Sequence, residues 1–158
     1  MPQTFSIQAI GRISCGRTEP DDDNWDAFPA IIRLDQAAFG PDALQGLESF
    51  SHVEVLYIFD RVGDEEIDTG ARHPRARADW PKIGIFAQRG KGRPNRIGAT
   101  ICRVVSVQGI ELKVLGLDAI DGTPVIDIKP VMSGFQPRGA FREPRWAQEI
   151  MRAYWTPE

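Results

Sequence analysis

Two apolar runs that meet at a tight turn leave few folds open to this chain. They occupy residues 97–107 and 110–117, with Gln108 and Gly109 between them. Apolar and charged residues alternate at the start of the second run, which is the pattern of a strand with one buried face. Strand-like runs that flank a two-residue turn typically pair side by side. We therefore predict a β-hairpin over these residues.

Other segments carry local signals of the same kind. Residues 52–61 are rich in β-branched and aromatic side chains, and Pro130 ends an apolar run because proline cannot donate to a sheet. Proline also favours the first position of a helix, which predicts a short helix near Pro41 and a second helix from Pro144. The second helix would carry Trp146, Ile150 and Ala153 or Tyr154 on one face. The predicted strands are residues 5–14 with Gly11 as a bulge, 52–61, 83–89, 97–107, 110–117 and 123–130. Residues 62–82 show no hydrophobic period and are predicted to be a long loop.

Many short strands at close intervals, with few helices, favour a mainly β (α+β) barrel over a doubly wound sheet. A length of 158 residues fits one domain, which we place over residues 1–158. The sequence has neither the glycine fingerprint of dinucleotide-binding folds nor a phosphate-binding P-loop. We predict one β-barrel with a few short helices and a C-terminal helix.

Composition and spacing argue against several classes of protein. The longest strongly apolar run, residues 53–59, is too short to cross a bilayer, and the N-terminus has no signal-peptide pattern. Cys15 and Cys102 form no paired spacing, and His52 and His73 are isolated, so neither a disulfide nor a metal site is predicted. We expect a soluble, cytoplasmic protein that binds no metal and no membrane.

The net charge of −3 conceals an uneven distribution. Residues 72–103 contain nine Lys or Arg and a single acid, Asp79, whereas the rest of the chain carries ten bases and 21 acids. Such a basic segment can concentrate a polyanion at one surface. The alternative is a solvated face whose cations pair with acids elsewhere, and charge pattern alone favours that alternative.

Within the basic segment, the stretch RGKGRPNRIG combines arginines with glycines. Arg89, Arg93 and Arg96 supply forked donors for phosphate or carboxylate, while Pro94 fixes the turn. Asn95 can hydrogen-bond a ligand edge. The alternative is a tight barrel turn whose arginines pair with nearby acids, and these residues leave both interpretations open.

The stretch LGLDAIDGTPVIDIKP places Asp118, Asp121 and Asp127 around Gly122. These carboxylates suit ribose hydroxyls, a cation or turn capping, and the Asp-Gly pair favours turn formation for Asp121. By itself, Lys129 is interpreted as structural or solvated. His52 is interpreted as a hydrogen-bonded packing residue rather than a catalyst. The aromatic side chains of the tail are interpreted as core or dimer surface; they are Trp146, Tyr154 and Trp155.

Three segments in the same order resemble a known family. GLESFSHVEVLYIFDR, GIFAQRGKGRPNRIG and LGLDAIDGTPVIDIKP are similar to segments of the TrmO (TsaA, YaeB) family. The resemblance spans about Gly46 to Pro130 and includes IGRIS near the start. It implies an S-adenosylmethionine-dependent methyltransferase on a single-sheeted β-barrel, working as a homodimer with the cofactor near the interface. The implied reaction methylates the N6 nitrogen of N6-threonylcarbamoyladenosine at position 37 of tRNA, which would give the basic segment a partner.

The resemblance also implies site residues. The cofactor contacts fall on Asp60, Arg61, Arg89, Ile101, Leu117, Asp118, Ala119 and Ile120. In this pocket, apolar side chains would cover the adenine ring, carboxylates or backbone groups would fix the sugar, and an arginine would meet the methionine carboxylate. The substrate would be positioned by Arg93, Asn95 and Lys129.

A urea-like nitrogen is a poor nucleophile, so we hypothesise that Asp118 or Asp121 helps to remove its proton. The family's proline–glutamine–proline segment, which contributes to the cofactor pocket, has no clear counterpart in residues 19–29. A second hypothesis is therefore a non-catalytic S-adenosylmethionine-binding or RNA-binding barrel. The retained stretch DGTPVIDIKP beside the arginine turn favours the enzyme.

Overall fold

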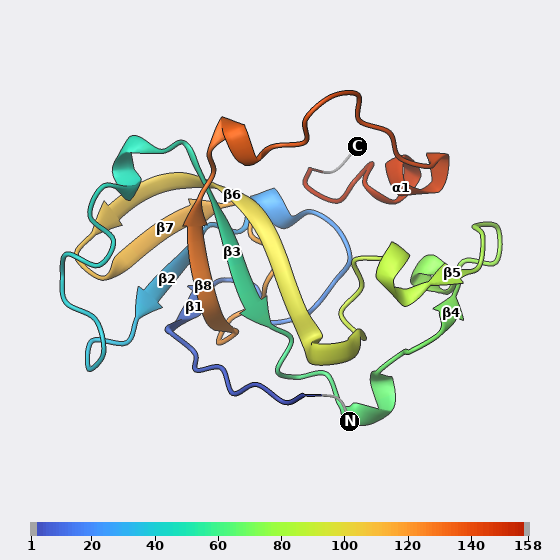
Figure 1. Ribbon diagram of the computed structural model, residues 1–158, viewed down its shortest axis with the longest axis horizontal. Coiled ribbons are helices and arrows are strands. Elements are labelled where there is room, and N and C mark those ends of the chain that lie inside the picture. Colours follow the sequence, from blue (N-terminus) through green and yellow to red (C-terminus); the bar gives the residue numbers. More distant parts are fainter. Residues whose placement is uncertain (1–2, 157–158) are drawn as a thin grey trace.

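The computed structural model describes residues 3–156, and six of its strands close into a barrel (Figure 1). The order around the barrel is β1-β2-β7-β6-β3-β8, and all neighbours are antiparallel. Its strands are β1 (Gly11–Cys15), β2 (Ala30–Leu34), β3 (His52–Ile58), β6 (Ile97–Gln108), β7 (Glu111–Leu115) and β8 (Pro124–Pro130). The predicted mainly β barrel is confirmed.

The predicted hairpin is formed by β6 and β7. Gln108 faces Glu111 across the turn, and Gly109 has a φ of 56°, in the left-handed region that glycine adopts without steric cost. β6 serves two partners, because residues 97–103 pair with β3 and residues 103–108 pair with β7. Residues 97–102 of β6 therefore do not pair with β7, and the two strands of the hairpin separate there. The candidate site lies at this opening.

Apolar side chains at alternate positions fill the barrel. Val53, Val55 and Tyr57 of β3 are fully buried in one core cluster, as are side chains of β7. Successive residues of a strand point to opposite faces, so this alternation is the pattern that predicted the strands. Leu117 and Ala119 follow β7 and belong to the same core.

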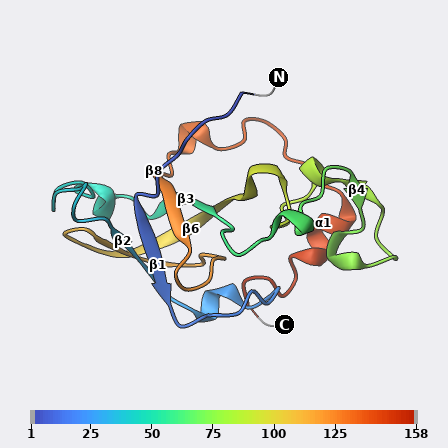
Figure 2. The same cartoon turned by 90° about the horizontal axis from the view of Figure 1, so that it is seen from below.

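A smaller group of elements lies beside the barrel (Figure 2). It contains a two-stranded ladder, β4 (Ala71–Arg72) and β5 (Ile83–Gly84), and the helix α1 (Arg145–Ile150). The 3₁₀ helices of the chain are Trp25–Ala27, Leu47–Ser49, Asp64–Glu66, Pro74–Ala76, Ile85–Ala87, Pro94–Arg96 and Ser133–Phe135. The predicted loop over residues 62–82 thus carries β4 and two of these single turns.

Two predicted elements differ in the structure. Residues 41–50 form turns and a 3₁₀ helix rather than the predicted short helix from Pro41, because Gly46 takes a φ of 94° that breaks helical geometry. The predicted strand 83–89 is reduced to β5, whose partner β4 has only two residues. The Gln88 side chain donates to the carbonyls of Arg72 and Ile83 and holds the turn that follows.

The first strand begins at Gly11, later than the predicted start at residue 5. Gly11 is not a bulge, because it pairs in register with Leu34 and with Val125. A Cβ atom at this position would lie 2.9 Å from the Leu34 Cα, a distance shorter than Cβ atoms adopt in proteins. The glycine is therefore required by the close approach of β1 and β2.

The C-terminal helix is present but shorter than predicted. Pro144 precedes α1 as its N-cap, and the helix ends at Ile150, so Ala153 and Tyr154 are not on its face. The chain turns back, and residues 153–155 lie beside residues 24–26 (Figure 1). Hydrogen bonds to that distant segment replace those that would have extended the helix.

Gly98 of β6 gives a prediction about packing. A Cβ atom at this position would lie 2.5 Å from the Tyr57 Cζ atom, so Gly98→Ala must displace a buried ring. We expect a loss of about 1–3 kcal/mol in the free energy of unfolding, as for other overpacked cores. Urea unfolding measures this loss. Gly84→Ala is the matched control, since its Cβ would have no neighbour within 4 Å, and equal stability of the two variants would contradict the prediction.

Candidate functional site

The opening between β6 and β7 brings several predicted site residues to one end of the barrel. Arg61, just after β3, donates to the carbonyls of Thr18 and Asp121, each at 3.2 Å. Arg89 donates to the carbonyl of Ala99 near the start of β6. Segments distant in the sequence are therefore joined at this end by two guanidinium groups.

Asp118 is the centre of a cluster of hydroxyl groups. Its Oδ1 atom accepts hydrogen bonds from the Tyr57 hydroxyl, at 2.8 Å, and from Thr100, and its Oδ2 atom accepts one from Tyr154. Burial, followed by the charge of Asp118, raises the pKa of both tyrosines above the usual range of a phenol. Both phenols therefore stay protonated and fix the carboxylate as donors.

Asp121 holds the turn between the end of β1 and the start of β8. Its Oδ1 atom accepts from the Cys15 amide at 3.0 Å, and its own amide donates to the Arg17 carbonyl at 2.8 Å. Gly122 has a φ of 81°, as expected for an Asp-Gly turn. The turn interpretation of Asp121 agrees with this geometry. Cys15, whose amide Asp121 holds, has a thiol with a raised pKa, and burial of that thiol is the main cause.

Arg17 builds the acidic loop that follows β1. Its guanidinium is buried and donates to the carbonyls of Glu19, Asp21 and Asp23, and it stacks on the Trp25 ring at 3.7 Å. Nothing in the local sequence pattern indicated this role, since an arginine in a polar stretch is normally solvated. The loop is consequently ordered around one cation.

Two of the apolar cofactor residues are placed differently from the expectation. Leu117 is 1% exposed and Ala119 is 5% exposed, so their side chains are in the core and cannot cover an adenine ring. Only the main chain of these residues is left to contact a ligand. Ile101, by contrast, is 46% exposed on the outside of β6, and Ile120 is half-buried.

Ile101 lines a cavity of about 310 Å³ beside the point where β6 leaves β7. The other lining residues are Asp26, His52, Arg103, Leu115, Gly116 and Trp155. An indole and aliphatic side chains make its walls, while a carboxylate and a guanidinium supply polar groups. This combination of apolar walls and few polar groups suits a purine nucleoside, and Ile101 is the residue of the implied cofactor set that lines the cavity.

The arginine turn is held by contacts within the protein. Arg93 donates to the Gln88 carbonyl at 2.8 Å, and Arg96 pairs with Asp64. Asn95 is exposed at a φ of 65°. Lys129 lies on the outer side of β8, paired with Asp127 at 2.6 Å. Lys129 is opposite Glu54 of β3, which is itself opposite Ile101, so one strand lies between Lys129 and the strand that follows the arginine turn.

Acids neutralise several cations of the basic segment. Arg72 pairs with Asp68 at 3.0 Å, Arg75 with Asp23 at 2.8 Å, and Arg77 with Asp79. Together with the Arg96 pair, these contacts agree with the interpretation of a face paired to acids.

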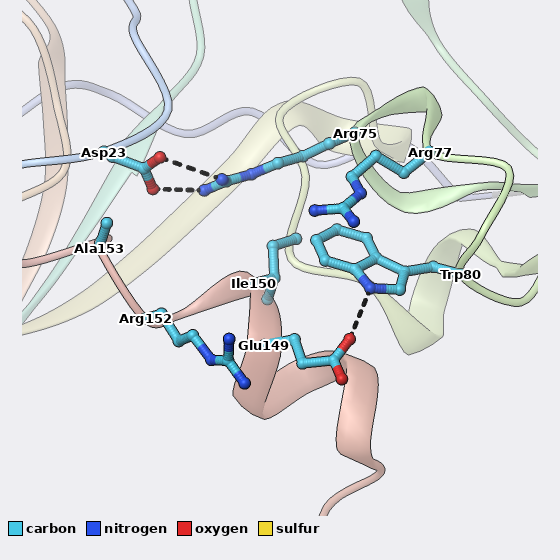
Figure 3. A pocket seen from close by; sticks show the side chains of 8 residues that line it. All are labelled: Asp23, Arg75, Arg77, Trp80, Glu149, Ile150, Arg152 and Ala153. Atoms are coloured by element: carbon cyan, nitrogen blue, oxygen red, sulfur yellow. Dashed lines mark hydrogen bonds and ion pairs between the residues drawn. The ribbon is translucent and has the colours of Figure 1, made fainter. Parts of the chain in front are cut away.

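A second cavity, of about 270 Å³, lies between this segment and α1 (Figure 3). Its lining residues are Asp23, Arg75, Arg77, Trp80, Glu149, Ile150, Arg152 and Ala153. The Trp80 indole donates to Glu149 at 2.8 Å, and Arg77 stacks on the same ring at 4.2 Å. These contacts join the basic segment to α1 within the smaller group of elements.

Two kinds of feature are absent from residues 3–156. No three His, Cys, Asp or Glu side chains in this range gather as metal ligands do. No helix in the same range has the length and apolar character needed to cross a membrane.

The sequence is similar to one family model and to several proteins with assigned names. A family model described as tRNA-methyltransferase O N-terminal domain matches residues 20–136. A human tRNA (adenine(37)-N6)-methyltransferase is 37% identical over 117 residues, which are 73% of this chain and 26% of that protein. A probable S-adenosyl-L-methionine-binding protein of Pyrococcus abyssi is 35% identical over 141 residues, 87% of this chain and 74% of that protein.

The fold has a similar counterpart among solved structures. The crystal structure of TrmO from Pseudomonas aeruginosa has a TM-score of 0.73 at 28% identity, with 92% of this chain and 63% of that chain covered. The chain spans only 21% to 26% of the length of the mammalian relatives that it matches.

Proposed function

The chain belongs to the tRNA-methyltransferase O N-terminal domain family, and from this premise we propose that it is an S-adenosylmethionine-dependent tRNA methyltransferase. The acceptor we propose is the N6 nitrogen of N6-threonylcarbamoyladenosine at position 37. The observation that carries the proposal is the family match over residues 20–136. In support, Arg61, Arg89 and residues 117–121 meet at one end of the barrel.

The cofactor supplies an electrophilic methyl group on its sulfonium, and the chain has to hold that group in line with the acceptor. Asp60, Arg61 and Arg89 form the polar end of the proposed site, where an arginine meets the methionine carboxylate. The side chain of Ile101 would contact the adenine ring. The main chain of residues 117–120 would contact the ribose.

Asp121 is our choice for the base, with Asp118 as a positioning residue. All three hydroxyl donors of the cluster converge on Asp118, so a proton could reach it only if one of them left. Asp121 uses a single carboxylate oxygen to hold the Cys15 amide. Arg93, Asn95 and Lys129 remain the proposed contacts to the substrate.

We also propose that the protein works as a homodimer in the cytoplasm, where its tRNA partner is found. The exposed apolar side chains of Val105, Met132 and Phe135 support an interface between copies.

The proposed function is tested by calorimetric titration with S-adenosylmethionine, followed by methyl transfer to tRNA that carries threonylcarbamoyladenosine. We expect saturable binding that is lost in Arg89→Ala, and transfer that falls about 100-fold in Asp121→Asn with cofactor affinity unchanged. Near-normal turnover in both Asp121→Asn and Asp118→Asn would remove the base assignment. Binding without transfer would favour the non-catalytic alternative, and the absence of binding would refute the function.

A further inference from the structure

The C-terminal strap, residues 153–155, is attached to the loop that follows β1 (Figure 1). The amides of Asn24, Trp25 and Asp26 donate to the three successive carbonyls of the strap, at 3.0, 3.0 and 2.9 Å. The strap lies outside residues 20–136, which the family model matches. Its position is therefore a feature of this chain that the family assignment does not explain.

Neighbouring side chains of the strap reach different places. The Tyr154 hydroxyl donates to the Oδ2 atom of Asp118, inside the opening of the barrel. Trp155 lines the 310 Å³ cavity, where its ring lies beside Gly116. The two rings pack edge to face, with centroids 4.9 Å apart, so each fixes the other.

We propose that the C-terminal strap completes the cofactor site, with Trp155 stacking on the adenine ring of S-adenosylmethionine and Tyr154 positioning Asp118. This inference rests on the proposed function. The indole is the only aromatic wall of the cavity except for the His52 imidazole, and an aromatic face is the surface on which a purine stacks. Asp26, at the same cavity, supplies an acceptor for an amine or hydroxyl of the nucleoside.

The direction of the ligand follows from β6. Arg89 donates to the carbonyl of Ala99, and Ile101 lines the cavity two residues further along the strand. Two residues of a strand span about 6.6 Å, which is the distance along β6 from Ala99 to Ile101. The edge of β6 therefore offers one position for the carboxylate end of a ligand and another for its ring end. In the proposed site, Arg89 would hold the methionine carboxylate and Trp155 would hold the adenine ring.

Calorimetric titration of the full chain with S-adenosylmethionine tests the inference. We expect Trp155→Ala to weaken binding about tenfold or more, because loss of an aromatic platform under a base has effects of that size. Trp155→Phe keeps a ring and should bind nearly as the wild type does. Trp146→Ala, on the same C-terminal segment but not lining the cavity, is the matched control and should be unchanged.

Fluorescence gives a second readout that a purely structural role would not produce. Adenosine, but not methionine, should quench part of the tryptophan emission, and this quenching should disappear in Trp155→Phe while persisting in Trp146→Phe. If Trp155→Ala does not fold, this experiment with Trp155→Phe decides the question.

The outcomes separate the inference from the function on which it rests. If the wild type does not bind S-adenosylmethionine, the proposed function and the inference both fail. If the wild type binds but Trp155→Ala binds equally well, or adenosine leaves the emission of Trp155 unchanged, the function stands and the inference is overturned. For Tyr154, Tyr154→Phe should lower kcat with little change in KM for tRNA, and an unchanged kcat would remove its positioning role.

Discussion

Asp118→Ala is expected to destabilise the protein by about 2–4 kcal/mol. The substitution removes the acceptor of three hydroxyl groups, and each buried donor left unsatisfied costs about 1–3 kcal/mol. Part of this cost is recovered, because the Tyr57 hydroxyl is 3.2 Å from Thr100 and 3.1 Å from the Asp118 carbonyl. Urea unfolding followed by tryptophan fluorescence measures the change.

Two further variants test the explanation. Asp118→Asn keeps the shape and one acceptor, so its loss of stability should be smaller than that of Asp118→Ala. Asp121→Ala removes an acceptor that serves a single amide, and we expect a loss of about 1 kcal/mol. Equal losses at positions 118 and 121 would show that the hydroxyl cluster does not organise this end of the barrel.

The parts of the fold that were predictable are those encoded by local periodicity. The alternation in residues 110–114 and the turn at Gly109 specify β7 and its hairpin with β6, because strand faces and tight turns depend on near neighbours. Pro130 likewise ends β8 as predicted. The barrel itself was favoured by the number of short strands, and the strand order that closes it came only from the structure.

Other elements depend on partners that are remote in sequence. The helix predicted to continue toward Trp155 stops at Ile150, because the strap after it binds residues 24–26 instead. The strand predicted over residues 83–89 is limited by the length of β4. Local propensity is a weak prior in such places, and tertiary contacts override it.

For the candidate site, the sequence predicted which residues take part but not where their side chains lie relative to one another. The family resemblance supplied Asp118 and Ile101, but it did not show that one faces a hydroxyl cluster and the other an outer cavity. Leu117 and Ala119 read as ligand contacts because they lie in the same motif, although their side chains fill the core. Tyr154 lies 36 residues from Asp118, a separation at which no periodic pattern reports contact.

Raising the pH above about 10 should strongly lower the free energy of unfolding, because both tyrosines of the chain contact Asp118. A tyrosine in the unfolded chain ionises near pH 10, whereas burial raises the pKa of Tyr57 and Tyr154 in the folded protein. Their contribution to stability is therefore complete below about pH 10 and is lost as the pH rises toward the folded pKa. We expect the free energy of unfolding to fall by about 1.4 kcal/mol per pH unit for each tyrosine.

Phenolate absorbance provides the direct measurement. The chain has two tyrosines, so the whole phenolate signal belongs to the Asp118 cluster. In urea both should titrate near pH 10, whereas in the folded protein neither should ionise until the fold is lost. Tyr154→Phe leaves Tyr57 as the remaining tyrosine and should halve the part of the pH dependence of the free energy of unfolding that comes from tyrosines. The part that comes from lysines is the same in both proteins and cancels in the comparison. A phenol that ionises near pH 10 in the folded protein would mean that its hydroxyl is not held against the Asp118 carboxylate, and the site would then lack the donor that orients it.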